Sequence, residues 1–170
     1  MSERELVLMA KNGDVDAFCA LYDIYKDRLY GYAYYKLENC SDAEDAVQSC
    51  VLSAFQQIGM LKRAEAFSSW IFKILNCCCT SVIKDQIKRR NTDDIESCIN
   101  LPSYSSEIDI ERQELKQALS VLKEEDREIV LLSFVGGFKS HEIAKICGLS
   151  AVNVRQRLSR SLARLKKELV

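Results

Sequence analysis

Apolar residues recur at three- and four-residue spacing through most of the chain, which is the period of an amphipathic helix. This spacing is clear over residues 14–35, 41–58, 67–90, 107–122, 124–134 and 150–167. No segment alternates apolar and polar residues for long enough to indicate a strand. The pattern therefore predicts an all-α protein.

Polar side chains that cap helices mark where several of these helices begin. Ser2 with Glu5, and Ser41 with Glu44, have the spacing of a capping box, in which two side chains satisfy the free N–H groups of a first turn. Asp14 stands at the start of the next periodic stretch and is expected to cap it.

The helical period is lost over residues 91–106. This segment contains the only proline, Pro102, together with several acidic residues and serines. Such a composition is typical of a flexible linker. We therefore predict two small helical domains, residues 1–90 and 107–170, joined by a flexible acidic linker at 91–106.

The stretch from residue 138 to residue 167 has the pattern of a helix-turn-helix. We expect Ser140 to cap a short helix that ends at Gly148, a residue that adopts the left-handed conformation without strain. Ser150 is expected to cap a second, longer helix. Two helices joined by such a turn place the second helix in the major groove of DNA.

The second of these helices has one apolar and one polar face. Val154, Leu158 and Leu165 share the apolar side, which can pack on a core. The opposite side carries long donors suited to base edges and phosphates: Arg155, Gln156, Ser159 and Arg160. Residues 150–167 contain six Lys and Arg and no acid. Charge alone would also fit a solvated helix end, but the caps, the glycine and the apolar register together favour DNA binding.

The overall composition narrows the function further. The chain of 170 residues has 24 Lys and Arg against 25 Asp and Glu, a formal net charge of -1. Clustered cations supply most of the affinity of a protein that binds DNA alone, so this balance suggests a DNA reader held in place by another partner. No Gly-rich phosphate loop, nucleophile elbow or Ser/His/Asp set is present. We therefore expect no enzyme activity and no cofactor.

The cysteines do not have the spacing of a metal site. There are eight of them and one His, with no C-x-x-C pair. Without a secretion signal a disulfide framework is not expected, and we predict that most of these thiols are small core residues. No apolar run approaches the ~20 residues of a membrane helix. A cytoplasmic location is therefore expected.

Three motifs in this order resemble those of bacterial sigma factors of the extracytoplasmic-function (ECF) type. They are DAEDAVQ at 42–48, FSSWIFKI at 67–74 and VRQRLSR at 154–160. The resemblance implies that residues 1–90 form sigma domain 2, which binds core polymerase and the promoter -10 element. It implies that residues 107–170 form sigma domain 4, which binds the -35 element.

The same resemblance implies roles for particular residues and partners. The surface implied to bind core RNA polymerase includes Asp42, Asp45 and Gln48. The cations implied to contact DNA at the -10 element are Lys62, Arg63, Lys73, Lys84, Lys88 and Arg89. The residues implied to contact the -35 element are Ser150, Asn153, Arg155, Gln156, Ser159 and Arg160. The family also implies an anti-sigma factor, in some cases anchored in the membrane.

The chain departs from the family pattern in the helix after residue 67. Where the family has Ala-Arg-Asn, this chain has Leu75, Asn76 and Cys77, and Ser81 replaces an Asp. These changes affect the expected -10 contacts more than the fold.

Two other interpretations remain open from the sequence. A stand-alone helix-turn-helix regulator would explain residues 107–170 but would leave the first ninety without a role. An interaction protein whose cysteines sense oxidants would need exposed thiols with lowered pKa values.

Overall fold

The computed structural model describes residues 1–90 and 114–169, without the side chains at 89, 90 and 169. Every regular element in these two ranges is helical, which confirms the predicted all-α fold. The α-helices are α1 (Glu3–Lys11), α2 (Val15–Leu37), α3 (Cys40–Gln57), α4 (Phe67–Arg90), α6 (Glu124–Phe134), α7 (Ser140–Cys147) and α8 (Ala151–Leu169). Two 3₁₀ turns, η1 (Ile58–Met60) and η2 (Ala64–Ala66), connect α3 to α4, and residues 114–120 are helical. The predicted linker at 91–106 and the helix start at Glu107 lie outside the described residues.

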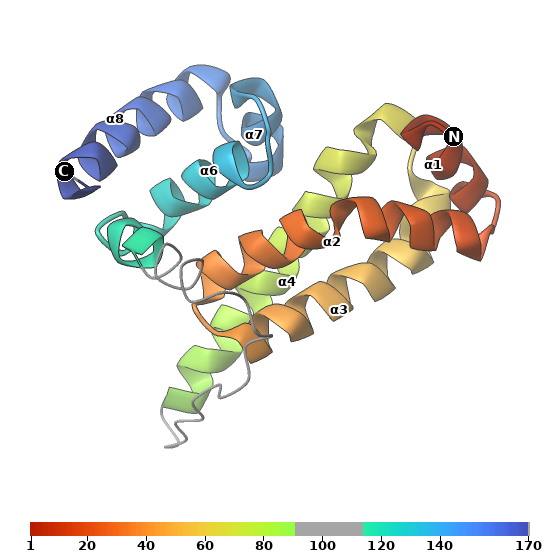
Figure 1. Cartoon of the computed structure of the whole chain (residues 1–170), viewed down its shortest axis with the longest axis horizontal. Coiled ribbons are helices and arrows are strands. Elements are labelled where there is room, and N and C mark those ends of the chain that lie inside the picture. The colour runs from red at the N-terminus through yellow and green to blue at the C-terminus, as the bar shows by residue number, and fades with distance from the viewer. Residues whose placement is uncertain (91–113, 170) are drawn as a thin grey trace.

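The N-terminal unit is a bundle of the three long helices α2, α3 and α4. Helix α1 lies across the end of the bundle where α3 leads into α4 (Figure 1). Aromatic residues of α2 meet those of α4 in the core. The rings of Tyr25 and Phe67 pack edge to face at 5.4 Å, and those of Tyr32 and Phe72 do so at 5.9 Å. Tyr25 and Tyr32 of α2 thus contribute to the core.

Helix α4 is more apolar than we expected from the sequence. Within the 25-residue segment Ala64–Lys88, an 18-residue window has a mean hydropathy of 1.4, so the segment is long and apolar enough by composition to cross a membrane. The expectation that no run approaches this length was therefore wrong. In the structure α4 packs against α2 and α3 and buries Phe67, Ile71, Phe72 and Leu75. A core helix passes the same compositional test.

The C-terminal unit consists of residues 114–120 and helices α6, α7 and α8. Both α6 and α7 pack on α8. Gly148 ends α7 with φ 70°, as predicted, and the N–H of Asn153 donates to Ser150 Oγ at 3.1 Å at the start of α8. Val154 and Leu165 face the core of this unit. The predicted helix-turn-helix is therefore confirmed.

The helix caps were predicted correctly in some places only. Ser2 with Glu5 forms a capping box, and the carboxylate of Asp14 accepts from Ala17 N–H at 3.1 Å. Ser41 does not cap α3, because that helix already begins at Cys40 and Asn39 accepts the N–H of Asp42. Ser140 does not cap α7 either, because it is the first helical residue.

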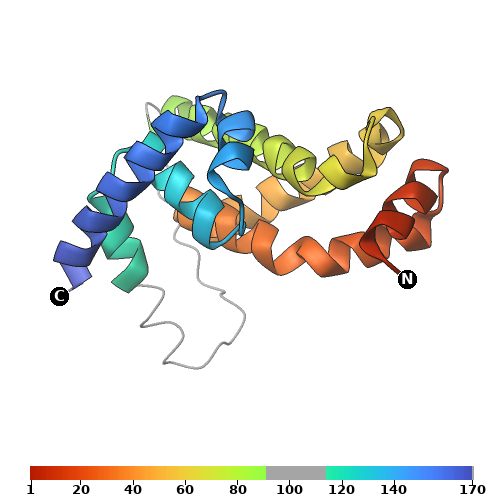
Figure 2. The same ribbon diagram turned by 90° about the horizontal axis from the view of Figure 1, so that it is seen from above.

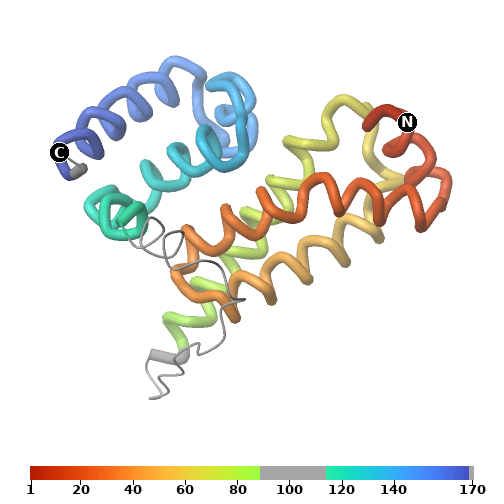
Figure 3. The backbone as a smooth tube through the Cα atoms, in the orientation of Figure 1, coloured from red at the N-terminus to blue at the C-terminus, as the bar shows by residue number. Residues whose placement is uncertain are grey.

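The two units are in contact. Helix α6 packs against α2, and α7 packs against α4 (Figure 2). Helix α1 and the end of α8 lie at opposite ends of the molecule (Figure 3).

The cysteines differ in their surroundings. Cys50 and Cys79 are buried, as expected of small core residues, but Cys19 and Cys77 are exposed. Cys40 is buried and disulfide-bonded, which corrects the expectation that disulfides are absent. No cluster of metal-ligating side chains occurs among the described residues.

Candidate nucleic-acid interface

One side of α8 is a solvent-exposed polar surface, here called the reading face. Its residues Arg155, Gln156, Ser159 and Arg160 are all exposed and together line an open hollow of about 510 Å³. The helix turns this face outward because Val154, Ser161 and Leu165 are buried on its other side. Four long or hydroxylic donors therefore project from a helix that is fixed by its packing.

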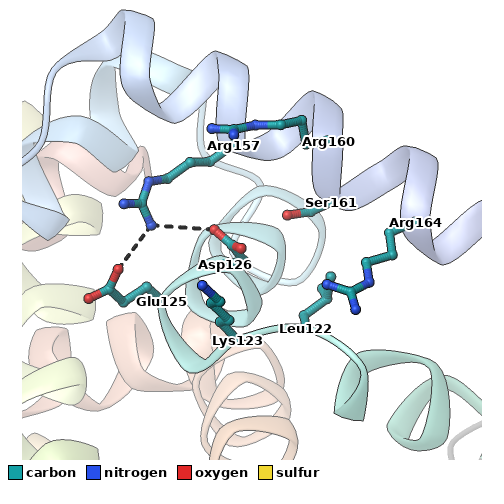
Figure 4. A pocket seen from close by; sticks show the side chains of 8 residues that line it. All are labelled: Leu122, Lys123, Glu125, Asp126, Arg157, Arg160, Ser161 and Arg164. Atoms are coloured by element: carbon teal, nitrogen blue, oxygen red, sulfur yellow. Dashed lines mark hydrogen bonds and ion pairs between the residues drawn. The ribbon is translucent and has the colours of Figure 1, made fainter.

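Not every arginine of α8 belongs to the reading face. Arg157 points back toward α6, where its Nη1 lies 2.9 Å from Glu125 Oε2 and 3.4 Å from Asp126 Oδ1 (Figure 4). The hydrogen bond that Arg157 donates to Glu125 is the largest cause that raises the pKa of Arg157. Its Nε donates to Asn153 Oδ1 at 3.0 Å. Arg157 thus connects the start of α8 to the start of α6.

A second cavity lies on this inner side of α8. It has a volume of about 350 Å³ and is lined from α6 and α8 (Figure 4). Its lining residues are Leu122, Lys123, Glu125, Asp126, Arg157, Arg160, Ser161 and Arg164. The carboxylates of Glu125 and Asp126 are occupied by Arg157. The remaining cations, at Lys123, Arg160 and Arg164, give the cavity a positive rim.

Two of the expected -35 residues are engaged within the protein. Ser150 Oγ caps α8, and Asn153 Oδ1 accepts from Arg157. Both side chains therefore position α8. The other four expected residues form the reading face and are brought together by α8 itself.

The cations expected at the -10 element lie on and before α4. Lys73, Lys84 and Lys88 are exposed, and steps of 11 and 4 residues place them on one side of the helix. We call these three residues the basic stripe. Lys62 and Arg63 are exposed in the connection that leads into α4. The side chain of Arg89 lies outside the described residues.

The expected polymerase-binding residues lie on α3 but differ in exposure. Asp45 and Gln48 are exposed, whereas Asp42 is half-buried and its carboxylate accepts a hydrogen bond from Gln86 of α4. Leu52, 64% exposed, continues the side of α3 that carries Asp45 and Gln48, at the helical spacing i, i+3, i+7. The sequence analysis did not predict a role for Leu52, although its spacing from Asp45 and Gln48 is visible in the sequence.

The departures from the family pattern fall in two environments. Cys77 and Ser81 are exposed on α4, on the side of the basic stripe. Asn76 points the other way, toward the C-terminal unit, and its Nδ2 donates to Glu128 at 2.8 Å. Asn76 therefore belongs to the contact between the units rather than to the outer surface of α4.

The buried thiols do not have the chemistry of oxidant sensors. Burial is the largest cause that raises the pKa of Cys79 and of Cys147, each to about 12, and it also raises the pKa of Cys50. A reactive cysteine has a lowered pKa and an accessible thiolate. None of these three thiols has a lowered pKa, and Cys50 and Cys79 are also buried, whereas Cys147 is half-buried.

Two family descriptions match this chain in sequence order. "Sigma-70 region 2" matches residues 21–92, and "Sigma-70, region 4" matches residues 112–165. The RNA polymerase sigma factor SigV of Bacillus subtilis (strain 168) is 30% identical over 145 residues, which cover 85% of this chain and 86% of SigV. The chain belongs to the ECF family of RNA polymerase sigma factors.

Other relatives of this sigma factor agree over nearly its whole length. The ECF RNA polymerase sigma factor SigW of Bacillus subtilis (strain 168) is 25% identical over 186 residues, covering 99% of this chain and 97% of SigW. The structure of CnrH in complex with the cytosolic domain of CnrY superposes with a TM-score of 0.77 at 22% identity, covering 98% and 96% of the two chains. The co-crystal structure of the sigma factor RpoE with the anti-sigma factor NepR from Bartonella quintana gives 0.76 at 25% identity, covering 91% and 98%.

Membership in this family gives the N-terminal unit a role. The sigma factor directs core RNA polymerase to specific promoters and initiates transcription. The alternative of a stand-alone helix-turn-helix regulator is not favoured, because the family match includes residues 21–92 as well as the helix-turn-helix.

Proposed function

We propose that the two units of this sigma factor divide promoter recognition between them. The C-terminal unit, residues 107–170, reads the -35 element with α8. The N-terminal unit, residues 1–90, binds core polymerase through α3 and the -10 element through α4. The observation that carries this division is the presence of two exposed basic surfaces, the reading face and the basic stripe, on different units.

The reading face suits direct readout of base edges. Arg bonds guanine in a bidentate manner and Gln bonds adenine in the same way, and each such contact discriminates against a wrong base pair by about 1–3 kcal/mol. Arg155, Gln156 and Arg160 provide these groups on an exposed helix surface. Ser150 and Asn153 hold the start of α8 in place and therefore support the readout indirectly.

The basic stripe suits contact with a phosphate backbone. Lys73, Lys84 and Lys88 follow the helix axis, so they would track a strand rather than a single base. Lys62 and Arg63 extend the charge beyond the start of α4. Cys77 and Ser81 replace the family's Asn and Asp on this surface, so the preferred -10 sequence would differ from that of other members.

The polymerase surface is the side of α3 with Asp45, Gln48 and Leu52. An exposed carboxylate, an amide and an apolar side chain together fit a polar partner surface with an apolar centre. Asp42 supports this surface through its bond to Gln86 rather than by direct contact.

Regulation and location follow from the same proposal. RNA polymerase and the chromosome are in the cytoplasm, where this sigma factor would act. An anti-sigma factor is a further partner, as it is for RpoE of Bartonella quintana. A membrane-anchored anti-sigma factor would keep the protein at the membrane until induction.

In vitro transcription with core polymerase tests the proposal directly. Core polymerase plus this protein should initiate at discrete sites, and the mapped sites should share sequence elements near -10 and -35. On a promoter whose -35 element has been replaced, the wild type and the Arg160→Ala variant should initiate equally well, because Arg160 then has no base contact to lose. Equal sensitivity to Arg160→Ala with and without the element would contradict the assignment of α8.

A further inference from the structure

The cavity on the inner side of α8 borders the reading face at Arg160, which lines both hollows. Its wall on α8 consists of side chains at the helical spacing i, i+3, i+4 and i+7, namely Arg157, Arg160, Ser161 and Arg164. The facing wall is the start of α6 (Figure 4). The volume of about 350 Å³ is at the lower end of the range for small-molecule sites, about 300–1,000 Å³. The cavity is therefore large enough for a small ligand.

A buried hydroxyl lines this cavity without a partner. Ser161 is only 3% exposed, and its Oγ points from α8 into the space beside Asp126 (Figure 4). Within the described part of the chain, this Oγ makes no hydrogen bond. A hydroxyl inside a helix often donates to the carbonyl four residues earlier, as Thr80 does to Asn76 at 2.9 Å. Burial of a polar group costs free energy unless it is hydrogen-bonded, so the Ser161 hydroxyl is available to a ligand.

The wall on α6 supplies further donors. Helix α6 begins at Glu124, and its N-cap residue Lys123 makes no side-chain cap. The first N–H groups of a helix have no partner within the helix, and the helix dipole places a partial positive charge at this end. Water alone would also satisfy a helix start. Together with the Ser161 hydroxyl, however, the start of α6 gives the cavity donors on two facing walls.

The side chains around the cavity have a net positive charge. The charged residues that line it are Lys123, Arg157, Arg160 and Arg164, against Glu125 and Asp126. Four cations and two carboxylates leave a charge of +2. Both carboxylates pair with Arg157, so the other three cations remain for an anion.

We propose that this cavity binds a small phosphorylated molecule with two phosphate groups. Arginine and lysine form strong charge-assisted hydrogen bonds with phosphate, and the start of a helix is a common phosphate site. Each phosphate group carries at least one negative charge at neutral pH, so two of them balance the charge of the lining. A DNA duplex lying across the rim would not bring a phosphate to the buried hydroxyl of Ser161. The cavity therefore fits a small ligand better than a nucleic-acid backbone.

A ligand in this cavity would compete with DNA for Arg160. One guanidinium cannot bind a phosphate on the inner side of α8 and a base edge on the reading face at the same time. The bound ligand should therefore weaken recognition of the -35 element. This consequence rests on the proposed function, in which Arg160 contacts that element, whereas the binding of the ligand does not.

Calorimetric titration of the full chain tests the site. The probes are inorganic pyrophosphate and ADP, and sulfate at equal ionic strength is the control for a general charge effect. Both probes should bind, and Ser161→Ala should weaken them about tenfold or more, because a hydrogen bond to a charged group is lost. The thermal midpoint of this variant should not fall, since the hydroxyl has no partner within the described residues. Lys123→Ala should weaken binding by a smaller factor.

Lys166→Ala is the matched control for the titration. Lys166 is an exposed cation of α8 that does not line the cavity, so this variant should bind both probes as the wild type does. Equal heats for the probes and sulfate would overturn the proposal, as would wild-type affinity in Ser161→Ala. A short duplex without a -35 element tests the other source of phosphate. If Ser161→Ala weakens that duplex while neither probe binds, the cavity belongs to the DNA backbone and the proposal is wrong.

Promoter binding by the polymerase holoenzyme separates the site from the proposed function. Saturating ADP should weaken binding to a promoter with the -35 element several-fold, and should have no effect when the element is replaced or when Ser161→Ala is present. If ADP binds the free chain but leaves promoter binding unchanged, the site stands and the competition for Arg160 is wrong. If promoter binding does not depend on the -35 element at all, the proposed function fails, and the calorimetry still decides whether the cavity binds phosphate.

Discussion

The guanidinium of Arg157 lies 2.9 Å from the carboxylate of Glu125, so an arginine in the middle of the recognition helix faces inward. Two residues before it, Arg155 is exposed on the reading face, and three residues after it Arg160 is exposed there too. The basic side chains of α8 therefore have two different surroundings. Arg157 orients the helix on α6, whereas Arg155 and Arg160 are exposed, as the proposed contact with DNA requires.

This difference predicts that Arg157→Ala affects the fold rather than the readout. The variant removes an ion pair whose partner Glu125 is mostly exposed, and exposed pairs contribute little. We expect the thermal midpoint to fall by less than about 4 °C. Promoter preference in run-off transcription, measured on promoters with matched and mismatched -35 elements, should remain that of the wild type. A changed preference would place Arg157 in the reading face.

Arg160→Ala should affect the readout of the -35 element rather than the stability of the fold. Loss of one good base contact costs about 1–3 kcal/mol, or roughly 5- to 150-fold in binding. Transcription from a -35-dependent promoter should fall within that range while the thermal midpoint stays unchanged. Arg164→Ala is the matched control, because it removes the same charge one turn further along α8 and Arg164, unlike Arg160, does not line the hollow of the reading face. If both variants reduce transcription equally, the reduction comes from the loss of positive charge in general and not from the loss of a base contact.

The helices and the helix-turn-helix were predictable because their signals are local. Gly148 and Ser150 act within one turn of the chain, so their roles could be predicted from spacing alone. The cap of α3 was placed wrongly because Asn39 and Ser41 are both good caps. Asn39 accepts the N–H of Asp42, so the helix begins two residues earlier than predicted.

The contact between the units could not be predicted from the sequence. Lys36 looks like an ordinary cation in the last turn of α2, and Glu128 looks like an exposed helix residue. Their pairing depends on how two units pack across 92 residues of sequence. Gly31 was the one available signal, because a glycine inside a strong helical pattern often marks a close approach.

The polymerase surface can be tested on α3. Asp45→Ala and Gln48→Ala should each weaken the binding of core polymerase several-fold, because both side chains are exposed at the centre of the proposed contact. Gln57→Ala is a matched control, since Gln57 is also exposed but lies about 180° around the helix from Gln48 and about 120° from Asp45. Asp42→Ala should lower the thermal midpoint through the loss of its Gln86 bond. If Gln57→Ala weakened the binding of labelled core polymerase more than the Asp45 and Gln48 variants, the prediction would be contradicted.

The basic stripe can be tested through its salt dependence. A phosphate contact to a single strand contributes about 0.7 to the slope of log affinity against log salt concentration. Lys84→Ala should therefore reduce the slope measured for polymerase bound to a melted promoter by roughly that amount, without changing the start site. Lys26→Ala is the control, because Lys26 is an exposed cation of α2 outside the stripe. An unchanged slope would remove Lys84 from the DNA contact.

Alkaline pH should destabilise this fold because several buried acids hold their protons in the folded state. Burial is the main cause that raises the pKa of Cys79 and of Cys147 from 9.0 to about 12, and that of Tyr25 from 10.0 to about 12. Between about pH 9 and pH 12 the folded protein therefore binds more protons than the unfolded chain, so the free energy of unfolding falls as pH rises.

Urea midpoints measured from pH 7 to pH 11 should be constant up to about pH 8 and then decline. Cys79→Ala should be less stable at neutral pH, where a cavity replaces the thiol, but should decline less steeply above pH 9. An equal slope in the variant would show that the Cys79 thiol does not contribute to the alkaline loss.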